Sequence, residues 1–186
     1  RGDPVHFHSD EGVRSNTTAE SLANLRPVFK KDGQVTAGNA STLNDGASAV
    51  LLADAEFAQQ QGWEVLGYVE DYCTSGVEPA RVMSAPITAV EMLLERNQLS
   101  VLDVDVYEHN EAFASASCSV AQELNIPEDR FNLHGGAVSL GHPLGASGTR
   151  CLITMLGVMR RLESSSGIVT LCLGGGNAVA MLVRRA

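Results

Sequence analysis

The stretch from His134 to Gly148 concentrates glycine residues around one histidine, His142. The glycine pair at its start lets the backbone bend or approach another group closely, and Pro143 is typical of the first position of a helix. We therefore expect His142 at the positive end of a helix dipole, beside outward-facing amides. The alternative is a structural histidine on a tight turn. Packing alone does not require so many glycines, so we favour a catalytic role.

A cysteine and three glycines form a second candidate, because Cys172 ends an apolar run and Gly174, Gly175 and Gly176 follow it. A thiolate acts as a base or nucleophile once its pKa is lowered, and glycine amides can face a developing oxyanion. The alternative for Cys172 is a small buried hydrophobic residue, which is the usual fate of a free cysteine.

Asn110 is the third candidate, since it stands at an expected junction between a strand and a helix. Capping of that helix would explain an asparagine there equally well. Together, however, a histidine, a thiol, an amide and a glycine turn fit acyl transfer better than redox or metal chemistry.

Composition narrows the class of protein. The 186 residues are 44% hydrophobic and 19% charged, which suffices for one domain with a core, or one domain and part of another. The net charge of -9 argues against nucleic acid or an anionic membrane surface as partner, and no apolar run is long enough to span a bilayer. The four cysteines lack CxxC spacing, which argues against disulfides and a zinc cluster. We interpret His6 and His8 as surface residues and expect no metal.

These candidate residues must be positioned by strands that alternate with helices, a pattern typical of an α/β layered fold with an antiparallel pair at its end. We expect helices over 18–25, 55–62, 88–97, 111–124 and 142–162, and strands over 47–52, 66–73, 104–107, 168–172 and 178–183. The helices over 111–124 and 142–162 are small or apolar on nearly every face, so we expect both to be buried on all sides.

Four segments resemble the motifs of the thiolase family, in that family's order and spacing. They are Asn110–Ala114, Gly135–Gly148, Cys172–Gly176 and, upstream, Thr36–Ala47. Thiolases are acyl-CoA acyltransferases built from two similar βαβαβαββ halves with a loop domain over coenzyme A. The resemblance implies a mixed β-sheet with buried helices. It also implies three parts: 1–35 as a remnant of the loop domain, 36–64 as the last strand and helix of the N-terminal domain, and 65–186 as the C-terminal domain.

The resemblance also implies roles for individual residues. His142 would activate a nucleophilic cysteine and help form an oxyanion hole, in which Asn110 would hold a water. Cys172 would move a proton to or from the substrate α-carbon, and the Gly174 amide would contribute to a second oxyanion site. The positions matched to coenzyme A contacts are Arg14, Ser21, Ala37, Ser41, Met83 and Phe113. Coenzyme A is then a substrate, and we expect no cofactor.

The family's nucleophilic cysteine lies in its N-terminal half, and none of Cys73, Cys118, Cys151 and Cys172 replaces it. We therefore expect the C-terminal half of a thiolase, inactive alone, whose partners are acyl-CoA, the N-terminal half and further copies in a homodimer or homotetramer. We expect a cytoplasmic location and keep organellar import as the alternative. Two rival functions are a non-catalytic, thiolase-like acyl-CoA or lipid carrier, which has no need of a proton relay, and a ketoacyl synthase-type enzyme, which would use two histidines.

Overall fold

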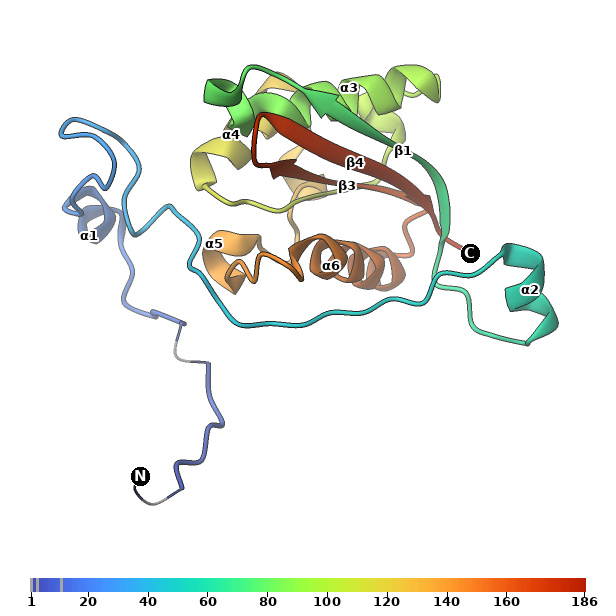
Figure 1. Cartoon of the computed structure of the whole chain (residues 1–186), viewed down its shortest axis with the longest axis horizontal. Helices are drawn as coiled ribbons and strands as arrows, with labels where there is room; N and C mark the ends of the chain where they lie inside the picture. Colours follow the sequence, from blue (N-terminus) through green and yellow to red (C-terminus); the bar gives the residue numbers. More distant parts are fainter. Residues whose placement is uncertain (1, 3, 11) are drawn as a thin grey trace.

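The computed structural model describes residues 2, 4–10 and 12–186, and its C-terminal two-thirds form a layered body (Figure 1). The N-terminal arm carries two short helices, α1 (Ala19–Ala23) and α2 (Ala55–Gln60), whose residues are exposed apart from Ala58. Thr18 caps α1, and Asp54 caps α2 by accepting from the Phe57 amide at 3.1 Å. These are the helices expected over 18–25 and 55–62, and both are shorter than expected.

A four-stranded mixed sheet in the order β1-β4-β3-β2 forms the centre of the body. Its strands are β1 (Tyr68–Gly76), β2 (Val106–His109), β3 (Ser166–Leu173) and β4 (Asn177–Arg184). The pairs β1–β4 and β3–β4 are antiparallel, whereas β2–β3 is parallel. The expected mixed sheet with an antiparallel pair at the end of the chain is therefore confirmed.

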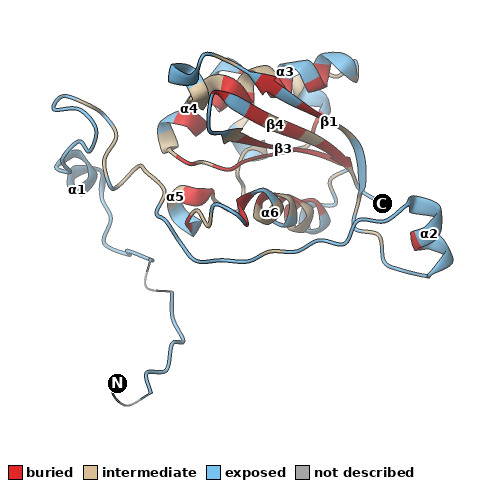
Figure 2. Ribbon diagram, viewed as in Figure 1, coloured by how far each residue is buried: buried red, intermediate tan, exposed pale blue. Residues whose placement is uncertain are grey.

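Helices cover both faces of this sheet (Figure 1). On one face lie α3 (Ala85–Arg96) and α4 (Ala114–Glu123), and on the other lies α6 (Ser147–Leu162). Successive residues of β3 point to opposite sides, so Ile168 packs into the α3 core and Val169 into the α6 core. Figure 2 shows the buried residues concentrated in the sheet and on the inner sides of these helices. A sheet covered in this way holds the ends of its strands in fixed positions.

Shorter elements connect these layers. They are the 3-10 helices η1 (Pro79–Ser84), η2 (Val101–Asp103) and η3 (Glu128–Arg130), and the single-turn helix α5 (Ala137–Leu140). None of the helices in the described part of the chain combines the length and the apolar character that crossing a membrane would need.

The strand expected over 47–52 is absent. This segment is extended and runs beside α6 (Figure 1), but none of the described strands pairs with it. The side chains of Leu51 and Leu52 are 76% and 70% exposed. A strand is defined by a hydrogen-bonded neighbour, so the apolar run predicted the extended backbone correctly but could not supply the pairing.

The helix expected over 88–97 begins earlier, at Ala85, because Pro86 occupies the first turn of α3 rather than closing a loop. The helix expected over 142–162 begins later, at Ser147. Pro143 to Ala146 form a turn in which the Ala146 amide donates to the Pro143 carbonyl at 2.7 Å. His142 therefore lies outside the helix, and its expected place at the helix terminus is wrong.

In this chain alone, the helices over 111–124 and 142–162 are not covered on all sides. In α6, Cys151 and Met155 are fully buried, whereas Ile153 and Leu162 are 43% and 49% exposed. In α4, Ser115 and Cys118 face outward. Small side chains allow a helix to lie close to the sheet, but they do not determine how many of its faces are covered.

Candidate active site

The parallel pair β2–β3 brings two of the predicted residues to one edge of the sheet. Asn110 follows β2 directly, and its amide donates to the carbonyl of Thr170 in β3 at 3.1 Å. Cys172 lies two residues beyond Thr170, near the end of β3. Because the carboxyl ends of parallel neighbours lie at the same edge, Asn110 and Cys172 open toward a common region.

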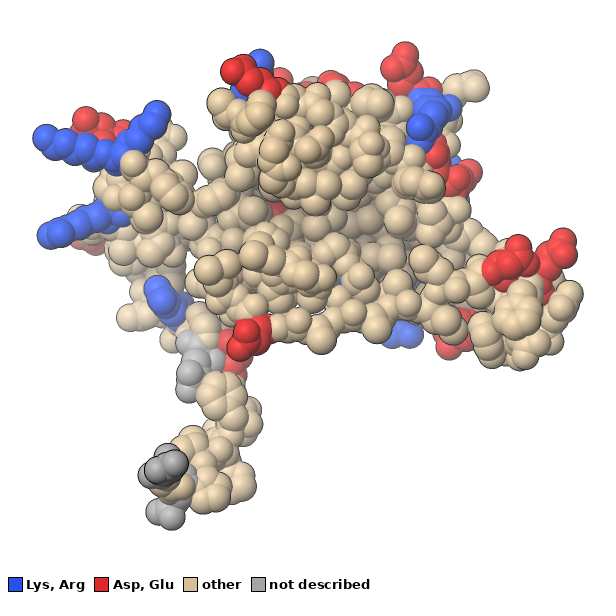
Figure 3. Space-filling view, viewed as in Figure 1, with Lys and Arg blue, Asp and Glu red and all other residues tan. Residues whose placement is uncertain are grey.

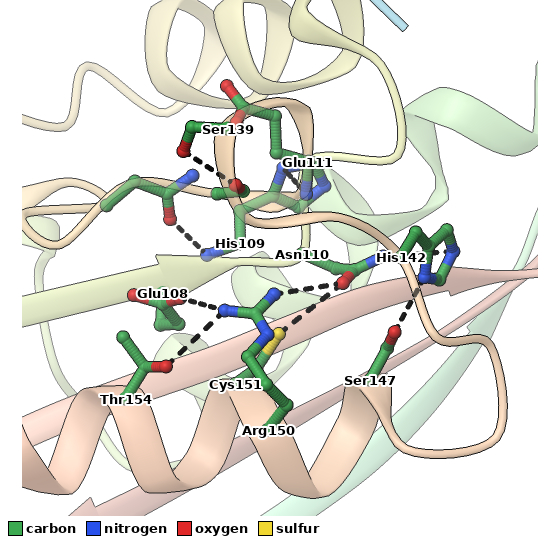
Figure 4. Close-up of polar contacts among 12 residues, drawn as sticks. Glu108, His109, Asn110, Glu111, Ser139, His142, Ser147, Arg150, Cys151 and Thr154 are labelled. Atoms are coloured by element: carbon green, nitrogen blue, oxygen red, sulfur yellow. Dashed lines mark hydrogen bonds and ion pairs between the residues drawn. The ribbon is translucent and has the colours of Figure 1, made fainter. Parts of the chain in front are cut away.

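The loop between α5 and α6 adds His142 to this edge (Figure 4). Its Nε2 lies 3.3 Å from Asn110 Nδ2, and its Nδ1 lies 2.6 Å from the hydroxyl oxygen of Ser147. Its backbone amide donates to the Thr42 carbonyl at 2.9 Å. Contacts on the backbone and on both ring nitrogens therefore fix the orientation of the imidazole.

The surroundings of His142 favour its neutral form. Burial lowers the pKa of His142, and the positive charge of Arg150 lowers it further. A neutral imidazole has one nitrogen free to accept a proton, which is the requirement for a general base. The geometry thus suits His142 for proton transfer.

Cys172 is held as a thiol. Its sulfur lies 4.0 Å from the sulfur of Met83, and burial raises the pKa of the Cys172 thiol. The sequence pattern pointed to a thiolate with a lowered pKa, and the structure provides the opposite shift because this position is largely desolvated. Gly174, two residues on, is exposed and has open space where a side chain would be.

The other three cysteines are not arranged as nucleophiles for His142. Burial raises the pKa of Cys73, whose thiol donates to the Ala89 carbonyl at 3.1 Å. Burial also raises the pKa of Cys151, to about 12. Cys118 lies exposed on α4. Within the described part of the chain, none of the thiols hydrogen-bonds His142.

Three of the predicted coenzyme A contacts lie near this edge. Phe113 pairs with Ala40 in an isolated β-bridge, and the Ser41 amide donates to the Ala112 carbonyl at 3.0 Å, which joins Ser41 to the segment after Asn110. Met83, beside Cys172, lines a hollow of about 270 Å³ between η1 and α4.

The other three predicted contacts lie farther out. Ala37 is exposed, in the loop before Ser41. Ser21 accepts from the Thr18 amide at 3.0 Å within the α1 cap, and Arg14 is exposed on the arm. The structure therefore brings Ser41, Phe113 and Met83 to the site region and leaves Arg14 and Ser21 in the arm.

Two charged residues behind Asn110 were not predicted from the sequence. Glu108 in β2 is fully buried, and its Oε1 pairs with Arg150 Nη1 of α6 at 2.9 Å. The second terminal nitrogen of Arg150, Nη2, donates to Asn110 Oδ1 at 3.1 Å. Burial raises the pKa of Glu108 to about 7, although Arg150 opposes the shift. The available signal was a carboxylate directly after the apolar residues Val106 and Tyr107.

Glu111 has a strained backbone next to Asn110, with φ of 60°. Its Oε2 accepts from the Val138 amide at 3.3 Å, which ties it to the start of α5. A Cβ at Gly136 would overlap the Glu111 side chain, so the glycine permits this close approach. A non-glycine residue in the left-handed region is typical of functional sites, where neighbours enforce it.

Comparisons with known proteins agree along the whole chain. Residues 1–56 match the family model of the thiolase N-terminal domain, and residues 63–185 match that of the thiolase C-terminal domain. The chain is 47% identical to an acetyl-CoA acetyltransferase of Pseudomonas aeruginosa over 185 residues, which are 100% of this chain and 47% of the relative. It is 45% identical to a probable acetyl-CoA acyltransferase of Staphylococcus aureus over the same shares.

Solved structures give the same result. The acetyl-CoA acetyltransferase of Bacillus anthracis superimposes with a TM-score of 0.94 at 39% identity, over 100% of this chain and 47% of that one. Human mitochondrial 3-ketoacyl-CoA thiolase superimposes with a TM-score of 0.91 at 38% identity, over 95% of this chain and 45% of that one. The chain spans about half the length of the curated relatives it matches.

Proposed function

The chain belongs to the thiolase family, and from that premise we propose that it is the C-terminal half of an acyltransferase. The reaction is transfer of an acyl group between acyl-CoA and CoA, either condensing two acyl-CoA molecules or cleaving a 3-ketoacyl-CoA. The observation that carries the proposal is the contact of Asn110 with His142 at the sheet edge that also holds Cys172. A non-catalytic carrier would have no use for this juxtaposition of an amide, a neutral imidazole and a thiol.

We assign the first half-reaction to His142 and to a cysteine of the N-terminal half. His142 Nε2 accepts the proton of that cysteine, and the thiolate attacks the carbonyl carbon of the acyl thioester. A carbon–sulfur bond to the cysteine forms, the bond to CoA breaks, and CoA leaves with the proton that His142 returns. Asn110 holds a water that hydrogen-bonds the transient oxyanion.

We assign the second half-reaction to Cys172 and Gly174. In the cleavage direction the Cys172 thiol gives its proton to the α-carbon of the departing acetyl-CoA enolate, while the Gly174 amide stabilises the enolate oxygen. In the condensing direction the same atoms act in reverse, and Cys172 must first be a thiolate. The raised pKa of the Cys172 thiol supports the role of proton donor.

A local group of cations around α1 supports coenzyme A as the substrate. Although the chain has a net charge of -9, the segment 12–31 carries four cations, Arg14, Arg26, Lys30 and Lys31, and one anion, Glu20. Figure 3 shows Lys and Arg side chains gathered at the α1 end of the molecule. Over the whole of 1–35 five cations and five anions cancel, so the local group of cations, and not a net charge of the arm, suits the phosphates of CoA. We therefore assign Arg14, Ser21 and Ala37 to the CoA headgroup side and Ser41, Met83 and Phe113 to the side near the reacting atoms.

We also propose the three-part division of the chain, with 1–35 from the loop domain, 36–64 from the end of the N-terminal domain and 65–186 as the C-terminal domain. The extended segment 47–52, which has no paired strand among the described residues, supports a partner in the N-terminal half. Assembly of the complete enzyme as a homodimer or homotetramer belongs to the same proposal.

Thiolysis of acetoacetyl-CoA by the complete enzyme, with this chain joined to its N-terminal half, tests the function. We expect His142→Ala to lower kcat by ~100–10,000-fold, because a general base is lost. His134→Ala is the matched control, since His134 is an exposed histidine of the same glycine-rich segment, and it should leave the rate unchanged. A His142→Ala rate within a few-fold of the parent would contradict the proposal.

A further inference from the structure

The buried pair of Glu108 and Arg150 has no evident packing role. The side chains of Glu108 and Arg150 are 0% and 18% exposed. Taking two charges out of water costs free energy that their attraction often does not recover, and apolar residues in place of such a pair are frequently neutral or stabilising. The pair is therefore better explained by what else Arg150 contacts.

Arg150 fixes which way the Asn110 amide faces (Figure 4). A guanidinium only donates, so the atom of Asn110 that lies 3.1 Å from Arg150 Nη2 must be the oxygen. The Cys151 thiol lies 3.6 Å from the same oxygen. With the oxygen directed to Arg150, the NH2 group of Asn110 is directed to His142. Glu108 holds the other arm of the guanidinium, so the fork cannot turn away.

The direction of the Asn110 amide then determines the proton of His142. Asn110 Nδ2 can only donate, so His142 Nε2, 3.3 Å away, must accept, and the ring proton lies on Nδ1. The Ser147 hydroxyl, 2.6 Å from Nδ1, donates its own proton to the Pro143 carbonyl at 3.1 Å and accepts the Nδ1 proton. All four contacts are satisfied by this one arrangement of protons.

Ser147 alone could not impose this arrangement. Its hydroxyl rotates, and it can donate to Nδ1 as readily as it can accept from it. Without a donor facing Nε2, the other tautomer, with the proton on Nε2, would be equally compatible with Ser147. The discriminating group is therefore the Asn110 amide, whose orientation depends on Arg150.

We propose that Arg150 and Glu108 are positioning residues that act through Asn110 to keep His142 in the Nδ1-protonated tautomer, with Nε2 unprotonated. The role of Nε2 as a catalytic base rests on the proposed function. The tautomer itself is a property of the chain and is measurable without turnover.

The test is a long-range ¹H–¹⁵N correlation spectrum of the histidine rings in the ¹⁵N-labelled 186-residue chain at neutral pH. The His142 signals are identified by their loss in His142→Gln. We expect the parent to show only the Nδ1-protonated tautomer. In the double variant Glu108→Met/Arg150→Met, which removes both buried charges together, we expect the Nε2-protonated tautomer to appear.

His109 is the internal control. It is buried, its Nδ1 contacts Ser117 at 2.7 Å, and unchanged His109 signals show that the fold is intact. A parent with the Nε2-protonated form, or a folded double variant that keeps the parent tautomer, would overturn the proposal. If the double variant does not fold, Asn110→Asp decides, because a carboxylate only accepts and must move the proton to Nε2. The Nδ1-protonated form alone in Asn110→Asp would equally overturn it.

Kinetics of the complete enzyme separate this inference from the proposed function. We expect the double variant to lower kcat by roughly tenfold to a hundredfold with KM little changed, because misplacement of a reacting group acts on the chemical step. A tautomer change with no thiolysis by the parent enzyme would refute the proposed function and leave the positioning role intact. Unchanged kcat together with a changed tautomer would refute the catalytic meaning of the tautomer.

Discussion

Cys172 is partly buried, and this burial favours the protonated thiol. Burial raises the pKa of its thiol, and its sulfur lies 4.0 Å from the thioether sulfur of Met83. A resting thiol has a proton to give, so it suits the cleavage direction without preparation. In the condensing direction another group must first remove the proton.

We predict that Cys172→Ala in the complete enzyme permits acyl-enzyme formation but blocks proton exchange at the α-carbon. The replaced thiol is the proposed proton carrier, and its loss should slow exchange by ~100–10,000-fold. The measurement is incorporation of deuterium into the methyl group of acetyl-CoA. Cys118→Ala, which changes an exposed cysteine on α4, should exchange at the parental rate. Parental exchange in Cys172→Ala would refute the assignment.

His109 makes folding stability depend on pH. Burial lowers the pKa of His109 to about 4, whereas an unfolded histidine titrates near 6.5. Between these values the unfolded chain binds a proton that the folded chain does not, so stability falls as the pH falls. Protonation of His109 in the unfolded chain should lower the free energy of unfolding by about 2 kcal/mol between about pH 7 and about pH 5.

Urea unfolding at the two pH values checks this expectation in the parent and in His109→Asn. The variant cannot take up the proton, so its free energy of unfolding should change less between the two conditions. All other groups titrate in both proteins and cancel in the comparison. Equal pH dependence in the two proteins would show that His109 is not the cause.

The three principal site residues could be predicted from the sequence because each lies in a segment with unusual local chemistry. His142 lies among the glycines of 135–148, Cys172 precedes three further glycines, and Asn110 stands at the end of a strand. Glu108 and Arg150 could not be predicted, because their contact depends on how α6 crosses β2, and the two residues are far apart in the chain. Local patterns identify reactive groups, but packing selects the groups that orient them.

At the scale of elements, the turn between β3 and β4 contains two glycines with positive φ, Gly175 and Gly176. Gly176 has φ of 93°, and a Cβ there would meet the Val77 carbonyl oxygen. Gly174 in the same turn has open space where a Cβ would be, and its φ is not in the left-handed region. Gly174 and Gly176 therefore form a matched pair within one turn.

We predict that Gly176→Ala lowers the free energy of unfolding by about 1–3 kcal/mol or more, because a side chain is forced into the left-handed region and against a carbonyl. Gly174→Ala should stay within about 0.5 kcal/mol of the parent. Denaturant unfolding monitored by circular dichroism measures both. Equal stabilities of the two variants would contradict the structural reason given for Gly176.

The order of strands and helices in the body followed from the sequence pattern, since residues 66–186 alternate between strand-like and helical segments. The lack of strand pairing at 47–52 and the exposure of the outer face of α6 were not predicted. A run such as Val50, Leu51 and Leu52 specifies extended backbone and apolar character, but none of the described strands pairs with it. Pairing and coverage are properties of the assembly, and a single sequence carries no direct signal for them.

At the scale of the whole molecule, the surface carries many large exposed apolar side chains. Leu51 and Leu52 are exposed on the extended segment, and the exposed rings of Phe57 and Trp63 pack edge to face near α2, with centroids 5.5 Å apart. Large contiguous apolar patches lead to association or aggregation. The four thiols, moreover, do not include one held against His142 in the described part of the chain.

We therefore predict that the 186-residue chain alone self-associates and does not cleave acetoacetyl-CoA. Light scattering after size-exclusion chromatography measures the first property, and loss of the 3-ketoacyl absorbance measures the second. Leu51→Ser/Leu52→Ser should shift the chain toward monomer, because it removes the most exposed apolar side chains of the segment, whereas Leu102→Ser, at an exposed leucine in η2, should not. Rescue of thiolysis by an added N-terminal half would identify the missing nucleophile as its contribution. A monodisperse monomer that cleaves the substrate alone would instead place the nucleophile among Cys73, Cys118, Cys151 and Cys172.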